Sequence, residues 1–363
     1  LRGATWKNLT QVGAFTRVIS TRGTTIQGAA PVAQAPINIY FGVATSSLVS
    51  NYPALIYGSF SDTTNWNGYL QNRTALFSDR VIVTVGLGYG QNHPDGRAVQ
   101  KGELTPNVAL VFNATKALAL YGSYATSFNP IDPTLENAAG VRGAFNSTTG
   151  KNYEFGAKYD LLNRRASATL SFFKNEIGNA LVQTGLTEVN RNGNRFYVEA
   201  GTRRSRGAEL TGDYQVRANW FVSGAVSYTD AIYTGSGPTS AAATLAIPGS
   251  RAEKTPRWAW NATSRYERSE GKLAGLAGSL SLLWQDERLG SNGARTLSAP
   301  DPLQLPAYAR VDTAISYRLN EHWDWALNFD NLTDRKIFVS ATVGSAIEIA
   351  TPRALTLRAS YRF

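Results

Sequence analysis

Cysteine is absent from the 363 residues of this sequence. Disulfide bonds, thiolate catalysis and thiolate metal sites are therefore excluded. Methionine is also absent, and no charged and then apolar leader precedes Leu1, so we expect an N-terminus that is processed or missing. The sequence has no run of about 18 apolar residues, which excludes a transmembrane helix. Membrane-spanning strands stay open, because their sequence signal is much weaker.

Histidine is scarce, since only His93 and His322 occur. A Ser-His-Asp triad or a zinc site would need one of them with converging partners, and neither lies in such a constellation. The glycines at 86, 88 and 90 could suggest a nucleotide loop, but they lie in an alternating segment with no helix behind it. We therefore predict no enzyme, no catalytic residues, no metal ligands and no directly bound cofactor.

The charge of the chain is strongly positive, with 36 Lys and Arg against 26 Asp and Glu and a formal net charge of +10. Nucleic acid is one explanation of such a balance. The basic residues are spread along the chain rather than clustered, so an anionic ligand or an anionic lipid surface explains the charge equally well.

Alternation of apolar and polar residues is what the sequence has in abundance, and the last ten residues show it most clearly. Leu355, Leu357 and Phe363 belong to an apolar row, and Arg358 and Arg362 belong to the polar row between them. A side-chain period of two predicts a strand with one apolar and one polar face.

The same alternation recurs about fourteen times, which predicts about fourteen strands joined alternately by short turns and long loops. The weakest of these strands is predicted over 7–19. Long loops are expected at 21–62, 128–151, 233–253 and 289–305. This organisation is typical of an up-and-down antiparallel barrel in an outer membrane. A soluble propeller would also alternate, but its blades should repeat with a shared motif about every 40 residues, and no such repeat is present.

Aromatic residues near the ends of the predicted strands fit interfacial girdles. They are Trp220, Tyr228, Trp258, Trp284, Tyr317 and Trp323. The polar row carries charged pairs, which suits the wet lumen of a wide barrel. These pairs are Glu154 with Lys158, Glu209 with Asp213, Arg310 with Asp312, and Arg358 with Arg362.

Five short motifs occur in the order in which one family of barrels has them. They are Ser205–Leu210 (SRGAEL), Ile247–Gly249 with Pro256, Pro306–Asp312 (PAYARVD), Asn328–Lys336 (NFDNLTDRK) and the terminal Tyr361–Phe363. Together they resemble TonB-dependent outer-membrane receptors, especially ferric-siderophore receptors. That family has a barrel of about 22 strands with a plug domain before it.

The resemblance implies an all-β transmembrane antiparallel barrel, of which residues 1–363 form the C-terminal portion, about the last 14 strands. The plug, the first strands and the segment that TonB grips are then missing from this chain. It also implies a multi-pass protein of the Gram-negative outer membrane that takes up a ferric siderophore by TonB-coupled active transport. The expected partners are the siderophore, lipopolysaccharide and outer-membrane lipid, and the TonB-ExbB-ExbD complex through the absent N-terminal part. Nucleic acid is not expected as a partner, and iron is expected only as the siderophore chelate.

Ligand-binding residues are expected at the extracellular mouth, because hydrogen-bond donors, arginines and aromatic rings suit a large polar chelate. The candidates are Tyr40, Tyr57, Trp66, Tyr69, Tyr121, Phe128, Arg195 and Tyr233. The basic run Arg203–Arg206 is expected to face lipopolysaccharide phosphates or an anionic ligand. Two alternatives stay open. One is a passive diffusion channel of the porin or fatty-acid type. The other is an adhesive barrel or an outer-membrane protease, for which His93 is the only hint.

Overall fold

The computed structural model describes residues 5–27, 55–94, 102–131, 135–143, 145–183, 196–199, 202–235, 248–291, 303–341 and 347–362. Within these ranges no helix is both long enough and apolar enough to cross a bilayer.

Fourteen strands form one antiparallel sheet, in which every strand pairs with the next large strand in the chain. Their bounds are β1 (Trp6–Gln27), β2 (Leu55–Leu76), β3 (Val81–Pro94), β4 (Glu103–Asn113), β5 (Leu118–Asn129), β6 (Thr148–Leu161), β7 (Ala166–Gly178), β10 (Arg203–Arg217), β11 (Trp220–Tyr233), β12 (Trp258–Glu267), β13 (Leu276–Gln285), β16 (Tyr308–Arg318), β17 (Trp323–Asp330) and β20 (Ala354–Tyr361). The order confirms the predicted up-and-down meander.

Six short strands form three small hairpins outside the main sheet. They are β8 (Leu181–Gln183) with β9 (Tyr197–Glu199), β14 (Arg288–Ser291) with β15 (Leu303–Leu305), and β18 (Phe338–Ala341) with β19 (Ile347–Ile349). Strands of three or four residues are too short to show a period of two, so the sequence pattern did not predict them. A 3-10 turn, η2 (Leu162–Arg164), joins β6 to β7.

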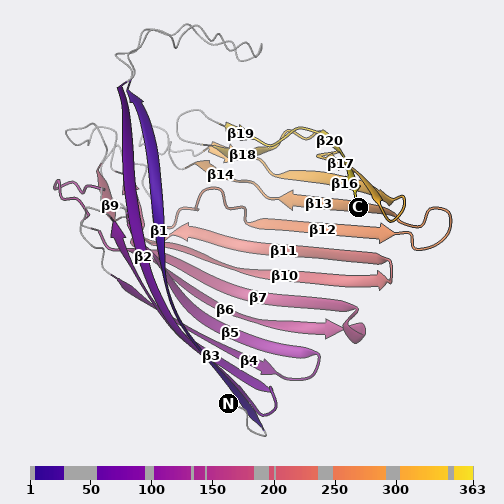
Figure 1. The fold of residues 1–363 in the computed structure, drawn as a ribbon, viewed down its shortest axis with the longest axis horizontal. Coiled ribbons are helices and arrows are strands. Elements are labelled where there is room, and N and C mark those ends of the chain that lie inside the picture. The colour runs from indigo at the N-terminus through magenta and orange to yellow at the C-terminus, as the bar shows by residue number, and fades with distance from the viewer. Residues whose placement is uncertain are drawn as a thin grey trace.

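The sheet curves strongly, and the strand direction turns from β1 and β2 to β12 and β13 (Figure 1). This follows from the right-handed twist that accumulates across many strands. Turns at 77–80, 114–117, 162–165, 218–219, 268–275 and 319–322 lie at one end of the sheet, which we call the short-turn end. The longer connections lie at the opposite end, the loop end. Both chain ends reach the short-turn end, where Arg362 N–H donates to the carbonyl of His322.

The expected long loop over 21–62 is wrong at both of its ends. β1 continues to Gln27 and β2 begins at Leu55, so that a hairpin with Ile26 opposite Ile56 extends past the neighbouring strands (Figure 1). These segments consist largely of small and polar residues without alternation. Backbone pairing satisfies their hydrogen-bonding groups all the same, which a hydrophobic pattern does not reveal.

One face of the sheet is apolar and unusually exposed, and we call it the lipid face. On β20 the side chains of Leu355 and Leu357 are 61% and 64% exposed, and Leu327 and Phe329 of β17 lie beside them. Continuous exposed apolar surface of this kind marks contact with lipid in a protein whose strands satisfy their own backbone groups. The prediction that the apolar rows face outward, and not into a closed dry core, is confirmed for β20.

Aromatic rings cluster on the lipid face near the strand ends, as predicted. Tyr228 and Trp258 have ring centroids 4.9 Å apart near the loop end, and Trp323 and Tyr361 have centroids 5.0 Å apart at the short-turn end. Two bands of amphipathic rings are expected where the bilayer core meets water.

Candidate lumen wall and loop-end site

The polar face of the sheet, which we call the lumen wall, carries the charged rows. Because side chains alternate strictly along paired strands, Glu154 of β6, Glu209 of β10, Arg265 of β12 and Arg358 of β20 all lie on this face, opposite the lipid face. Among the described residues, no group of three or more His, Asp or Glu side chains is arranged to hold a metal ion.

Tyr121 and Glu154 form the best-defined contact of the wall. The Tyr121 hydroxyl donates to Glu154 Oε1 at 2.7 Å across the β5–β6 pair. Gly156 lies between them, and a Cβ built there would come within 2.8 Å of the Tyr121 hydroxyl. The glycine therefore leaves the space in which the phenol leans toward the carboxylate. Lys158 adds a cation 5.3 Å from the Tyr121 ring centroid.

Replacing Tyr121 by phenylalanine is expected to lower the free energy of unfolding by about 1 kcal/mol, because a hydrogen bond to a partly exposed carboxylate is lost. The urea midpoint of the purified intact protein in detergent measures this change. The matched control is Tyr124→Phe, on the lipid face of the same strand, where the hydroxyl makes no hydrogen bond within the described residues. Equal midpoints for the two variants would contradict a stabilising Tyr121–Glu154 contact.

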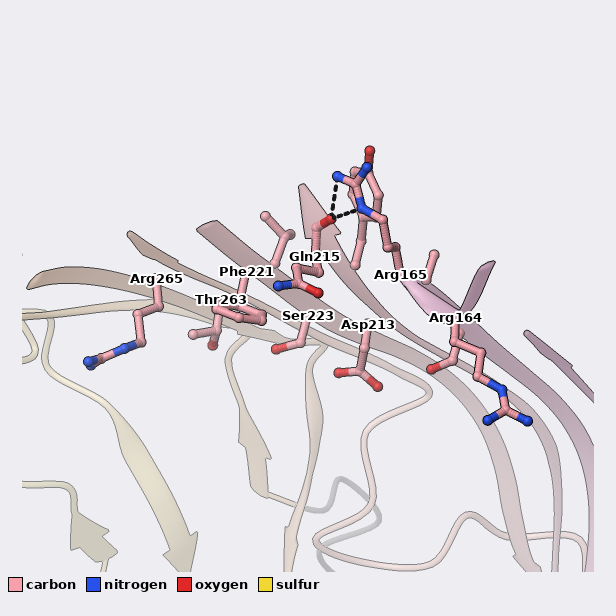
Figure 2. A pocket seen from close by; sticks show the side chains of 12 residues that line it. Arg164, Arg165, Asp213, Gln215, Phe221, Ser223, Thr263 and Arg265 are labelled. Carbon is pink, nitrogen blue, oxygen red and sulfur yellow. Dashed lines mark hydrogen bonds between the residues drawn. The ribbon is translucent and has the colours of Figure 1, made fainter. Parts of the chain in front are cut away.

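A hollow of about 370 Å³ opens on the lumen wall toward the short-turn end. Figure 2 shows Asp213, Ser223 and Thr263 pointing to one side of the sheet, with Arg265 beside them. Arg165 points the other way and is occupied, since its Nη2 donates to the Gln215 carbonyl at 3.0 Å. The hollow therefore presents hydroxyls and one carboxylate, with Arg265 at its rim.

A second hollow of about 390 Å³ shares Arg265 with the first and is richer in arginine. Asp324 forms ion pairs with two arginines of this hollow, Arg362 at 2.9 Å and Arg318 at 3.4 Å. Arg265 pairs with Glu267 at 3.2 Å, while Arg358 has no partner among the described residues. Four arginines against two carboxylates leave this part of the wall suited to acidic groups.

Hydrogen bonds join several of the connections at the loop end to one another. The Tyr233 hydroxyl donates to Glu253 Oε2 at 2.6 Å and so ties the segment 248–257 to the end of β11. Lys254 N–H donates to the Leu289 carbonyl, which joins that segment to β14. Arg288 is 3% exposed and donates to the carbonyls of Phe338 and Val339, so it fastens β14 to β18.

The predicted mouth residues are scattered along the described structure. Tyr233 lies at the loop end, on the lumen wall. Phe128 lies near the loop end of β5, where its ring reaches Gly90. Tyr69 lies on the lumen wall of β2 over Gly13. Trp66 lies on the lipid face of β2 and is 53% exposed, so it does not point into the lumen.

The other four candidates stand apart from these. Tyr121 lies three residues from the start of β5, so the structure places it at the short-turn end and not at the mouth. Tyr57 belongs to β2, opposite Thr25, and its side chain is outside the described part. Tyr40 and Arg195 lie outside the described residues. Whether any of the eight binds a ligand stays a prediction.

Sequence reasoning did not single out Arg265 or Glu253 as site residues. For Arg265 the signal was the polar row of its strand, which predicts the face of a residue but not its position along the sheet. Glu253 lies in the connection between β11 and β12, where no such row exists. Arg265 meets Arg358 and Arg362 in one hollow only through the register of β12, β13, β16, β17 and β20. That register depends on the lengths of the turns between these strands.

Comparisons with known proteins agree on one family. The model described as "TonB dependent receptor-like, beta-barrel" matches residues 4–332. The metal-pseudopaline receptor CntO of Pseudomonas aeruginosa is 27% identical over 292 residues, which are 80% of this chain and 38% of the relative. The ferrichrome outer membrane transporter/phage receptor of Escherichia coli is 27% identical over 344 residues, which are 90% of this chain and 42% of the relative.

The fold has a close match among solved structures. The ferric-catecholate import receptor Fiu of E. coli, in its closed form, superposes with a TM-score of 0.76 at 18% identity, over 100% of this chain and 53% of that one. At this identity the likeness concerns the fold. The chain spans about two-fifths of the length of the curated relatives just described.

Proposed function

Because this chain belongs to the TonB-dependent receptor β-barrel family, we propose that it serves the uptake of a ferric siderophore by TonB-coupled active transport. The observation that carries the proposal is the family match over 4–332, on a sheet with a lipid face and a charged lumen wall. Relatives named as receptors for metal-pseudopaline and as a transporter of ferrichrome give the ligand class its support.

We further propose that residues 1–363 form the C-terminal portion of a larger barrel. The strands β1 and β20 each pair with one neighbour only in the described sheet. An open strand edge in lipid leaves backbone groups unsatisfied, at several kcal/mol for each group. Additional strands between these edges, with a plug domain inside, would satisfy them. The greater length of the relatives supports this arrangement.

The transported ligand in this proposal is a chelate in which the siderophore, and not a protein side chain, coordinates the iron. Tyr233 and the segment 248–257 stand at the loop end, where a ligand from outside would first meet the receptor. Aromatic and hydrogen-bonding groups suit a large polar ligand. The arginine-rich hollow near the short-turn end would contact acidic groups of the plug. TonB with ExbB and ExbD would supply energy through the plug.

Uptake of radiolabelled iron tests the proposal. The intact protein is produced in cells that lack other siderophore receptors, and accumulation is measured with ferrichrome, a ferric catecholate and a ferric mixed-type siderophore. We expect saturable uptake of at least one chelate, and its loss in cells without TonB or with a collapsed proton gradient. Uptake that continues without TonB and does not saturate would instead identify a passive diffusion channel and overturn the proposal.

A further inference from the structure

A group of charged side chains lies on the lipid face of β6, β7, β10 and β11, toward the loop end. It consists of Lys151, Lys174, Glu176, Arg204, Arg206 and Asp230, which we call the outer basic patch. Strand pairing places it in two rows. One row runs through Lys151, Glu176 and Arg204, and the other through Tyr153, Lys174, Arg206 and Asp230.

The patch shares its face with the apolar rows and not with the lumen wall. The pairing of β7 with β10 runs without a shift from Arg203 to Tyr214, so Arg206 is on the same side as Leu210 and Tyr214. Lys174 Nζ lies 5.6 Å from the centroid of the Tyr153 ring, which confirms that the two side chains share a side. A ligand inside the barrel therefore cannot reach the patch.

Charges within the patch are not balanced. Lys174 lies directly opposite Arg206 in the register, and like charges in such cross-strand positions repel. Asp230 is shared, since its Oδ2 is 3.2 Å from Arg206 Nε and 3.9 Å from Arg204 Nη2. Glu176 is 2.7 Å from Lys174 Nζ. Four cations thus share two carboxylates.

One donor of the patch is left without any acceptor. Arg204 Nε is buried and makes no hydrogen bond, while the whole side chain is 25% exposed. An unsatisfied donor on a charged group is costly, so a negative charge beside the Arg204 guanidinium would stabilise this arrangement. Arg206 is 60% exposed and Lys174 is 47% exposed, so both are accessible to such a group.

Aromatic rings fix the height of the patch in the membrane. Tyr153 lies directly opposite Lys174 and contacts Tyr124, with ring centroids 4.9 Å apart. Tyr228 and Trp258 lie on the same face, next to the patch on its short-turn side. Such rings mark the boundary between the hydrocarbon core and the headgroups. The patch therefore lies at the level of the headgroups of the leaflet on the loop side.

We propose that the outer basic patch binds the phosphate groups of lipopolysaccharide in the outer leaflet. Arginine forks match phosphate oxygens in pairs, and lysine adds a point charge, so a phosphate between Lys174 and Arg206 would relieve their repulsion. The position beside the acyl chains favours a phosphorylated glycolipid over a free phosphate ion. This site needs only the outer-membrane location and is independent of the transported ligand.

The test compares two charge-matched double variants of the intact protein. Lys174→Gln with Arg206→Gln removes two cations of the patch, whereas Arg268→Gln with Lys272→Gln removes two exposed cations at the short-turn end. Each purified protein is incubated with detergent micelles that contain lipopolysaccharide with or without its lipid A phosphates. Bound glycolipid is measured by native mass spectrometry, and inorganic phosphate is added in separate samples as a competitor. Heat-modified mobility checks that every variant is folded.

We expect binding of the phosphorylated glycolipid to fall about tenfold in the patch variant, because two basic contacts with an anionic lipid surface are lost. The control variant should bind like the unaltered protein, and removal of the phosphates should abolish the difference between the variants. Inorganic phosphate should not compete. Equal binding by both variants, equal binding of the dephosphorylated glycolipid, or full competition by inorganic phosphate would each overturn the proposal.

Discussion

Replacing Gly207 by alanine is expected to destabilise the sheet more than any other single methyl group added to it. Gly207 lies in β10, between Phe173 of β7 and Thr229 of β11. A Cβ built on it would collide with the carbonyl oxygen of Tyr228 and would lie 2.8 Å from Phe173 Cζ. Phe173 can move, but the Tyr228 oxygen belongs to the backbone of the neighbouring strand.

The expected cost is about 3 kcal/mol of unfolding free energy, at the upper end of ordinary overpacking, because backbone on a paired strand must shift. The urea midpoint of the purified intact protein and its heat-modified mobility in gels measure the effect. The control is Gly278→Ala in β13, where an added Cβ meets no atom within 4 Å. That variant should stay within about 0.5 kcal/mol of the unaltered protein. Equal stability of the two variants would show that β10 and β11 adapt without cost.

Replacing Asn331 by alanine is expected to loosen the loop that follows β17. Asn331 is 1% exposed and has a φ of 50°. Its Nδ2 donates to the Arg335 carbonyl at 2.9 Å, and its Oδ1 accepts from the Arg335 N–H at 3.0 Å. Its own N–H donates to Asp312 Oδ1 at 2.7 Å, and Asp312 also accepts from Arg310 Nε at 2.8 Å.

Alanine removes these two side-chain hydrogen bonds and a longer one from Nδ2 to the Thr351 carbonyl at 3.4 Å. It also forces a side chain without local hydrogen bonding into the left-handed region. The expected loss is about 3 kcal/mol, since each unsatisfied buried group costs about 1–3 kcal/mol and the backbone conformation adds more. Asn331→Gly keeps the conformation and loses only the side-chain bonds, so it should lie between alanine and the unaltered protein. Urea midpoints of the three proteins give this order.

The matched control is Asn163→Gly, an exposed asparagine with a φ of 54° in the turn between β6 and β7. It shares the left-handed conformation but has no comparable buried network, so its stability should change by less than about 0.5 kcal/mol. If Asn331→Gly were as harmless as Asn163→Gly, the buried network would not stabilise the loop.

Alternation within each strand made most of the fold predictable. The rows around Leu355 and Arg358, or around Phe155 and Glu154, depend only on a side-chain period of two, which is a local property of the extended chain. Count, order and direction of the large strands followed from it, together with the outer-membrane location. The hairpin ends near Gln27 and Leu55 could not be predicted this way, because their polar residues carry no period.

Two motifs that the sequence analysis identified separately meet in the structure. Arg310 and Asp312 belong to PAYARVD, and Asn331 belongs to NFDNLTDRK. The β16–β17 pairing places them side by side, so that Asp312 bonds to both Arg310 and Asn331. Nothing in either motif alone indicates that the Asp312 carboxylate accepts hydrogen bonds from residues of both motifs.

The sequence by itself determined that this protein is a membrane barrel wall of antiparallel strands, with its apolar rows toward lipid and its polar rows toward the lumen. Alternation is a property of each single strand, so it can be recognised without knowing which strands pair. Only the tertiary structure decided which charges become neighbours, such as Lys174 with Arg206 or Arg358 with Arg362 and Arg265. The position of a residue relative to residues on other strands depends on register and curvature. Both are properties of paired strands and not of any single strand.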